Sequence, residues 1–427
     1  MKKKFDMTII GGGPMGLYLG FLLSKKGYKI RIFETNANAG GHARPFKFNN
    51  TIIEIFYHFF YKNDHHSAMK WVNIFSKKSK IYWKEINTEI ITKNDKINID
   101  NFFEIIKTYK FSSIKIYYNL FIIFNFKIPK SIISEKATKW AINKFGESFT
   151  NDIWIPLIKG KFGKNWKNIS ALWLATRIKR HLSTKNLINK KSIFGYLEKT
   201  YLPTILDTIK SLNNQGSRII CEAKIKKIIF SKNRISKIIT DKTYVIDKDE
   251  KVISTIPLFS LKNIARNKKL NYLKKFNGIG VVVCIFEIKK KLSNFYWTSV
   301  SDDNLPFNAI IQQNRLFPKS TNEIVYTSKY TTAQSNLYKM NNEQIADLIF
   351  MNLEKIYENF SKSDVINYKI IKSKNAAPIP DTKTINKLPP FKSPIDNLWH
   401  GGLEYIYPED RGVGNSIEIS EKLSNYF

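Results

Sequence analysis

Cysteine is scarce in this chain, which has only Cys221 and Cys284 among its 427 residues. Two cysteines cannot build the disulfide framework of a small secreted protein, so we expect a reducing compartment and a cytoplasmic protein. Long apolar runs are also missing. The most apolar segment, 116–126, has eleven uncharged residues, whereas a membrane-spanning helix needs about 20. Because glycines at 11–13 interrupt the apolar stretch near the N-terminus, the sequence predicts neither a signal peptide nor a transmembrane helix.

Acidic residues and arginine are in short supply too. The chain has 35 Asp and Glu against 70 Lys and Arg, a formal net charge of +35, and only nine of the basic residues are Arg. Such a charge suits nucleic acid or an anionic membrane, but phosphate recognition favours the guanidinium geometry of Arg. The excess of Lys, Ile and Asn is typical of drift toward codons rich in adenine and thymine, so we predict no nucleic-acid partner. The informative arginines are then Arg44, Arg177, Arg180, Arg315 and Arg411.

The rest of the chain is organised around the segment 8–44. An apolar strand at 8–10 runs into a glycine turn, a helix is expected over 15–26, and a second strand over 29–33. Three glycines of this segment have the spacing G-x-G-x-x-G: Gly11, Gly13 and Gly16. In this pattern the first glycine permits the tight turn, the second lets the backbone approach a pyrophosphate, and the third lets the helix pack closely on the strand.

The residues that follow complete a dinucleotide site. Pro14 and Met15 begin the predicted helix, whose first N–H groups and partial positive charge favour phosphate. Glu34 ends the second strand, 23 residues after Gly11, where a carboxylate accepts hydrogen bonds from the adenosine ribose. This carboxylate would repel a 2′-phosphate, so NADP is not expected here.

A second glycine turn lies just beyond. Gly40 and Gly41 can present successive N–H groups to an anion, and Arg44 can grip phosphate oxygens with two hydrogen bonds. The whole stretch resembles the N-terminal fingerprint of the FAD-dependent amine oxidase and protoporphyrinogen oxidase-like superfamily, which also includes carotenoid desaturases and, more distantly, UDP-galactopyranose mutase. The resemblance implies tightly bound FAD rather than NAD.

A chain of this length suggests two domains. The resemblance implies an α/β fold, in which a Rossmann-like FAD/NAD(P)-binding domain of the GR2 type is interrupted by an α+β substrate domain with a helical cap and a mixed β-sheet. The expected FAD-binding domain comprises residues 1–64, 191–265 and 388–427. The expected substrate-binding domain comprises residues 65–190, the helical part, and 266–387, the sheet part.

The resemblance also implies flavin contacts outside the fingerprint. It places His58 near the flavin, although a histidine between aromatic residues is often a packed core residue. It assigns the adenine contact to the backbone of Ile225. Near the C-terminus it implies a helix N-terminus against the flavin and a carboxylate on its ribityl chain, for which the candidates are Asp410, Arg411, Gly412 and Val413.

Residues 66–190 are expected to be mainly helical. For 116–126 we expect a buried cap helix, with a helix at the membrane interface as the alternative, so peripheral contact with the inner face of the membrane stays open. The pattern P-L-x-x-x-x-F-G over 156–163 resembles a segment of bacterial protoporphyrinogen oxidase-like proteins. Three residues that follow it would share one helix face: Trp173, Arg177 and Arg180. That face suits either an acidic substrate or simple exposure to solvent.

The resemblance implies an FAD-dependent oxidoreductase that oxidises a C–N or C–C bond of a small molecule by hydride transfer to FAD. The alternative is a flavin-dependent isomerase like UDP-galactopyranose mutase, acting on a sugar nucleotide. No catalytic side chain can be assigned, because the sequence contains no evident Ser-His-Asp or paired-carboxylate arrangement. His65 and His66 lack partners at metal-ligand spacing, so no metal is expected. The substrate, the electron acceptor and the oligomeric state stay open.

Overall fold

The strand, glycine turn, helix and second strand predicted near the N-terminus all form. In the computed structural model, β1 (Met7–Ile10) leads into α1 (Pro14–Lys25), and β2 (Ile30–Phe33) returns parallel to β1. Every residue of both strands is buried, as the apolar runs predict. The structure describes residues 4–62, 65–77, 79–93, 95–98, 101–110, 112–184 and 191–427.

These strands belong to a parallel sheet with the order β10-β2-β1-β14-β20. The other three strands are β10 (Arg218–Ile220), β14 (Lys251–Ser254) and β20 (Leu398–His400). The sheet thus collects strands from three distant parts of the chain, as expected of an interrupted Rossmann-like domain. The domain boundaries themselves stay a prediction.

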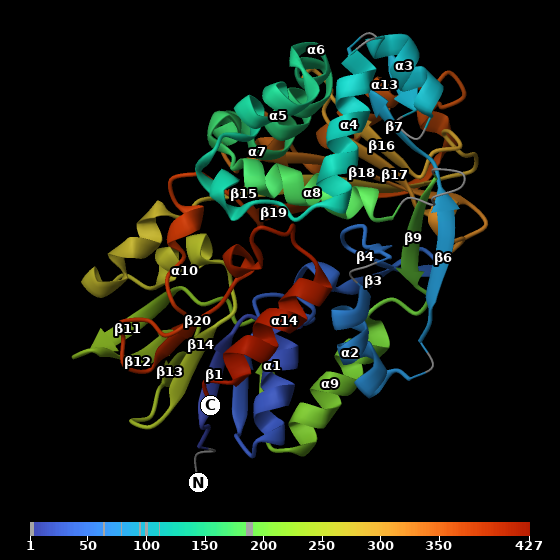
Figure 1. Ribbon diagram of the computed structural model, residues 1–427. Coiled ribbons are helices and arrows are strands. Elements are labelled where there is room, and N and C mark those ends of the chain that lie inside the picture. The colour runs from blue at the N-terminus through green and yellow to red at the C-terminus, as the bar shows by residue number, and fades with distance from the viewer. Residues whose placement is uncertain are drawn as a thin grey trace.

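Helices and a small sheet cover the two faces of the parallel sheet (Figure 1). One face shares a hydrophobic core with α1, α2 (His65–Phe75), α9 (Leu202–Asn214) and α14 (Val413–Ser424). The other face packs against three antiparallel strands and a helix: β11 (Lys227–Ser231), β12 (Arg234–Ile239), β13 (Thr243–Val245) and α10 (Leu258–Ile264).

The second large sheet has the order β19-β15-β18-β17-β16-β7-β8. Its strands are β7 (Thr88–Ile91), β8 (Lys96–Asn98), β15 (Gly278–Ile288), β16 (Trp297–Val300), β17 (Ala309–Gln312), β18 (Glu323–Thr331) and β19 (Val365–Pro378). The helix α13 (Asn342–Ile356) packs its buried face against one side of this sheet. The hairpin of β3 (Pro45–Phe48) and β4 (Thr51–Glu54) shares a core with the other side. Two short helices complete this part: α11 (Gln313–Leu316) and α12 (Asn336–Lys339).

A helical layer lies over this sheet (Figure 1). Its members are α3 (Phe102–Tyr109), α4 (Ser112–Asn125), α5 (Ala137–Phe145), α6 (Glu147–Phe149), α7 (Ile155–Phe162) and α8 (Ala171–Leu182). The layer has its own core, which includes Trp140, Phe145 and Trp173. Gly160 lets α7 lie against Asn308, which precedes β17, because a Cβ there would lie 2.5 Å from the side-chain amide nitrogen of Asn308.

The expectation that residues 66–190 are mainly helical is wrong for 81–98. This segment forms β6 (Ile81–Ile86), β7 and β8. β6 pairs with β9 (Ser192–Leu197), which also pairs with β5 (Phe60–Tyr61). The segment is rich in β-branched and aromatic residues, which fit a pleated surface. Two of its strands pair with residues more than 100 positions away, β6 with β9 and β7 with β16. No local sequence pattern indicates such a partner.

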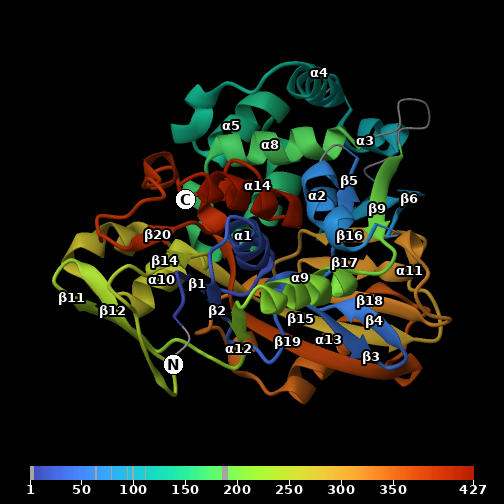
Figure 2. The same cartoon turned by 90° about the horizontal axis from the view of Figure 1, so that it is seen from below.

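The helix α4 is buried on one side only. Ile116 and Ile123 pack into the core of the helical layer, whereas Ile114, Tyr118 and Phe121 are 70%, 64% and 60% exposed on the opposite face. The expectation of a fully buried helix is therefore wrong. Figure 2 shows α4 at the outer margin of the molecule. None of the helices in the described ranges combines the length and apolar character needed to cross a membrane.

Candidate functional site

A cavity of about 790 Å³ connects the glycine turns of the parallel sheet with the helical layer and the second sheet. Its size lies in the range of small-molecule sites. Most of the predicted site residues line it: Gly11, Gly13, Pro14, Met15, Glu34, Gly41, Arg44, His58, Ile225, Asp410, Gly412 and Val413. Gly16 and Gly40 do not line the cavity, but each packs against a residue that does, Gly16 against Gly11 and Gly40 against Arg44.

The first glycine turn is built as its spacing predicts. Gly11 has a φ of +109°, which glycine adopts without strain. A Cβ on Gly16 would lie 1.9 Å from the carbonyl oxygen of Gly11, so only glycine lets α1 start this close to β1. A Cβ on Gly13, in contrast, would meet no chain atom closer than 3.7 Å. The chain itself therefore tolerates a side chain at Gly13, and a bound group is the reason to exclude one.

The second glycine turn lies against the first. Gly40 and Gly41 have φ values of +120° and +55°, and a Cβ on Gly41 would lie 3.0 Å from the Cα of Gly13. Arg44 follows on this turn, and its guanidinium makes no hydrogen bond with any residue of the described ranges. A half-buried cation without such a partner, beside two glycine turns, suits a phosphate.

Glu34 is held in place at the end of β2. Its carboxylate accepts hydrogen bonds from the Gly12 N–H at 3.1 Å and from the Asn36 N–H at 2.8 Å. Only 6% of the residue is exposed. Its Oε1 also accepts from the Asn36 side-chain amide at 2.6 Å. Glu34 therefore keeps acceptor capacity on Oε2, with which it can accept from one further hydroxyl group.

Ile225 lies near the same end of the cavity, in an irregular segment before β11. Its backbone N–H and C=O make no hydrogen bond with the described residues. Both groups are thus available to a planar ring with a donor and an acceptor, as predicted for adenine.

The N-terminus of α14 faces the cavity as the N-terminus of α1 does. Gly412 precedes the helix, and neither this helix nor α1 has a side-chain cap at its first turn. Gly412, Val413 and Asn415 line the cavity. Two uncapped helix starts at one cavity place two partial positive charges there.

His58 also lines the cavity, and it contacts a second histidine that the sequence did not single out. The Nε2 of His58 lies 3.0 Å from the carbonyl oxygen of His42. Burial lowers the pKa of both rings, that of His42 to about 3, so both are neutral at physiological pH. Neutral rings in the wall shape the cavity without adding charge.

Asp410 binds cations of the helical layer. Its Oδ2 accepts from Lys161 of α7 and from Arg177 of α8, the latter at 2.6 Å, and its Oδ1 accepts from the Arg411 N–H at 3.0 Å. Burial alone would raise the pKa of Asp410, but the charges of Lys161 and Arg177 outweigh burial and lower it. The carboxylate thus joins α7 and α8 of the helical layer to the loop before α14. The predicted contact of Asp410 with a ribityl chain stays a prediction.

Lys161 is the other member of this cluster. Burial lowers its pKa to about 7, against the opposing effect of Asp410, and the neighbouring charges of Arg177 and Arg411 lower it further. Arg411 donates hydrogen bonds to the Ala376 carbonyl oxygen and, at 2.7 Å, to the Tyr330 hydroxyl. Its guanidinium thus has neutral oxygen partners.

The sequence did not reveal several of these residues. Lys161 is one lysine among sixty-one and had no distinguishing neighbour. For His42, its position directly after Gly40 and Gly41 was the one feature of the sequence that could have indicated a place at the site. The second sheet and its loops also contribute to the lining, for example through Trp297, Ser299, Asn308, Ser328 and Tyr330. The predicted face of Trp173, Arg177 and Arg180 does point into the cavity.

A buried carboxyl behind the cavity gives a pH-dependent prediction. Burial raises the pKa of Glu404 to about 7. At a pH below the ordinary pKa of Glu, this carboxyl is protonated in both the folded and the unfolded protein. As pH rises toward 7 it ionises only in the unfolded protein, so the free energy of unfolding falls by roughly 3 kcal/mol. We expect Glu404→Gln to remove this slope. Urea unfolding of both proteins at pH 5 and pH 8 measures it, and equal slopes would contradict the assignment.

Comparison with known proteins agrees with this geometry. Residues 9–75 match the model of the NAD(P)-binding Rossmann-like domain. The chain is 49% identical over 43 residues to a 4,4′-diapophytoene desaturase of Methylomonas sp. and 48% identical over 40 residues to ferredoxin–NADP reductase 1 of Shouchella clausii. These matches span 10% and 9% of this chain, and only 8% and 12% of the two relatives. The chain therefore contains a Rossmann-like nucleotide-binding domain.

Solved structures share the fold over nearly the whole chain. A protein described as a protoporphyrinogen oxidase, from Exiguobacterium sp. 255-15, has a TM-score of 0.74 at 13% identity, with 98% of both chains covered. Putrescine oxidase bound to putrescine has a TM-score of 0.68 at 11% identity, covering 99% of this chain and 98% of its own. Reduced UDP-galactopyranose mutase has a TM-score of 0.71 at 13% identity, covering 99% and 96%. The predicted fold class and the predicted resemblance to this group are confirmed.

Proposed function

We propose that this protein is an FAD-dependent oxidoreductase that oxidises a C–N or C–C bond of a small molecule. One observation carries the proposal: a single cavity joins the two glycine turns to a region lined by many aromatic side chains, among them Tyr57, Trp173, Trp297 and Tyr330. Bound FAD would supply hydride-accepting chemistry, which needs little acid–base machinery from the protein.

The residues around the cradle fit this cofactor. Gly13 leaves room for a diphosphate, the guanidinium of Arg44 has no hydrogen-bond partner among the described residues, and Glu34 is fixed where a ribose would bind. The start of α14 would stabilise negative charge on the reduced cofactor. The two neutral histidines and the aromatic walls would exclude water from the reacting bond.

The second candidate function is an isomerisation of a sugar nucleotide. The fold shared with UDP-galactopyranose mutase and the cationic helices α7 and α8 favour it. Anaerobic mixing separates the two functions. An oxidoreductase substrate, found by screening small amines, alcohols and acids, bleaches the oxidised flavin in one equivalent. Isomerisation of UDP-galactopyranose by dithionite-reduced protein, with no substrate bleaching the oxidised form, would overturn the oxidoreductase proposal.

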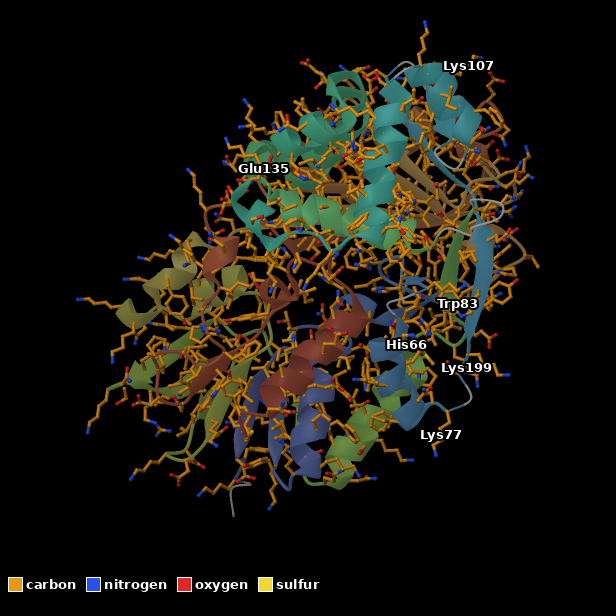
Figure 3. The ribbon with its side chains drawn as sticks, in the orientation of Figure 1. His66, Lys77, Trp83, Lys107, Glu135 and Lys199 are labelled. Atoms are coloured by element: carbon orange, nitrogen blue, oxygen red, sulfur yellow. The ribbon has the colours of Figure 1, made fainter. Side chains whose placement is uncertain are left out.

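Contact with a membrane surface is part of the same proposal. The exposed face of α4 carries Ile114, Tyr118 and Phe121. Lys115 of the same helix is also exposed, and Lys107 of α3 lies at the outer end of the helical layer in Figure 3. Apolar side chains beside lysines suit an anionic bilayer surface. In this arrangement a substrate dissolved in the membrane would meet the helical layer before it meets the rest of the protein.

We expect a triple variant, Ile114→Ser, Tyr118→Ser and Phe121→Ser, to bind vesicles of phosphatidylglycerol and phosphatidylcholine at least about tenfold more weakly. Cosedimentation measures the difference. The control replaces three exposed apolar residues elsewhere, Leu206, Val245 and Met351, which are 54%, 59% and 48% exposed, and should bind like the parent. Equal binding by both variants, or none by the parent, would rule out this surface.

A further inference from the structure

The end of the cavity between α7, α8 and the second sheet has an excess of positive charge. Among the described residues at this end, the cations of the helices and the C-terminal loop are Lys161, Arg177, Arg180 and Arg411. Two carboxylates oppose these four cations: Asp410, bound by Lys161 and Arg177, and Glu409, 3.8 Å from Arg180. Lys374 adds a further positive charge at the rim.

Arg177 is the cation best placed to meet a ligand. It donates to Asp410 through one terminal nitrogen, and 39% of its side chain remains exposed. The guanidinium stacks 5.7 Å from the ring centroid of Trp173, which also lines the cavity. Stacking on Trp173 and pairing with Asp410 fix the orientation of the guanidinium, so its remaining N–H groups are pre-organised for a planar anion.

The walls around these cations are aromatic. Tyr57 and Phe59 make edge contacts with Trp297, with ring centroids 5.2 and 5.6 Å apart. Tyr330 lies on the other side of the cluster, where Lys161 sits 5.7 Å from its ring centroid. These rings can bury an apolar body, and the side chains of Ser299 and Asn308 add neutral hydrogen-bonding groups.

We infer that the substrate is an amphiphilic anion, with a carboxylate or phosphate group held by Arg177 and an apolar body packed between the aromatic walls. This inference rests on the proposed cofactor in the other half of the cavity. A diamine, such as the ligand bound to putrescine oxidase, would lose its hydration beside four cations, whereas the described residues at this end provide only Asp410 and Glu409, which already lie beside Lys161, Arg177 and Arg180. This end of the cavity therefore disfavours cationic substrates as well as favouring anionic ones.

Three probes with one shared body test the inference: naphthoate, naphthyl phosphate and naphthylmethylamine. Each is titrated into the purified holoprotein, and binding is followed by flavin absorbance and by quenching of tryptophan fluorescence, since Trp173 and Trp297 line the cavity. We expect at least one acid to bind saturably, and about tenfold or more tighter than the amine. Which acid binds better distinguishes a carboxylate from a phosphate substrate.

Two variants of α8 locate the site. Arg177→Met should weaken binding of the acids about tenfold. Arg177→Lys should bind the acids with intermediate affinity, because it keeps the positive charge but lacks the paired N–H donors of the guanidinium. Lys179→Met removes a charge from the same helix, outside the cavity wall, where the ammonium donates to the Phe126 carbonyl oxygen, and should bind like the parent. Equal or tighter binding of the amine, no binding by any probe, or unchanged binding by Arg177→Met would each overturn the inference.

The two proposals fail in different ways. If the protein contains FAD but prefers the amine, the cofactor proposal stands and the anion inference falls. If the protein has no FAD and the acids still quench tryptophan fluorescence in an Arg177-dependent way, the anion inference stands and the cofactor proposal falls.

Discussion

Gly13→Ala should abolish binding of FAD while leaving the fold intact. The new Cβ would point into the cradle, where the diphosphate needs the bare backbone, and no chain atom lies within 3.7 Å of it. We expect affinity for FAD to fall by about a hundredfold or more, since the loss combines a steric clash with lost N–H contacts. The flavin absorbance of the purified variant, and titration of the apoprotein with FAD, measure the effect.

The matched comparison is Gly16→Ala, whose Cβ would collide with the carbonyl oxygen of Gly11 at 1.9 Å. This variant should lower the melting temperature of the apoprotein as well as FAD binding. Gly13→Ala should melt like the parent apoprotein. Full FAD occupancy in Gly13→Ala would show that the diphosphate does not lie at the first glycine turn.

Asp410→Asn should destabilise the protein by about 3 kcal/mol at pH 6, because it leaves the buried ammonium of Lys161 without its counter-charge. The carboxylate is the shared partner of Lys161 and Arg177, and their side chains are 12% and 39% exposed. The loss should be smaller at pH 9, because the pKa of Lys161 is lowered to about 7 and the amine is then neutral. Urea unfolding at the two pH values gives both numbers.

Two controls accompany this variant. Asp303→Asn breaks the pair with Lys159 on the same helix, but both side chains are more than 40% exposed, so the change should stay below about 1 kcal/mol. Combining Lys161→Met with Asp410→Asn should recover part of the loss, since the variant no longer buries that charge. Wild-type stability of Asp410→Asn at pH 6, or a larger loss at pH 9, would contradict the ion-pair account.

The cradle could be predicted from the sequence because its residues are close together in the chain. The turns at Gly11 and Gly41 are defined by local spacing, and Glu34 ends the strand between them. Steric limits on the backbone leave few alternatives to glycine at such positions. The helix start at Gly412 was predictable for a similar reason, although only the resemblance pointed to its role.

The rest of the cavity could not be predicted, because its parts meet only through the fold. Lys161 and Asp410 are 249 positions apart, and neither residue's neighbours indicate the pairing. The strands β6 and β7 pair with β9 and β16, which lie more than 100 residues away in the chain. For α4, apolar spacing predicted a helix, but it could not tell which apolar face the core would cover.

The most direct test of the central claim is the absorbance spectrum of the purified protein, followed by mass spectrometry of the ligand released on heating. The account predicts a flavin spectrum and the release of one FAD per chain. A colourless protein that takes up no FAD on incubation, or one that releases NADP instead, would contradict it.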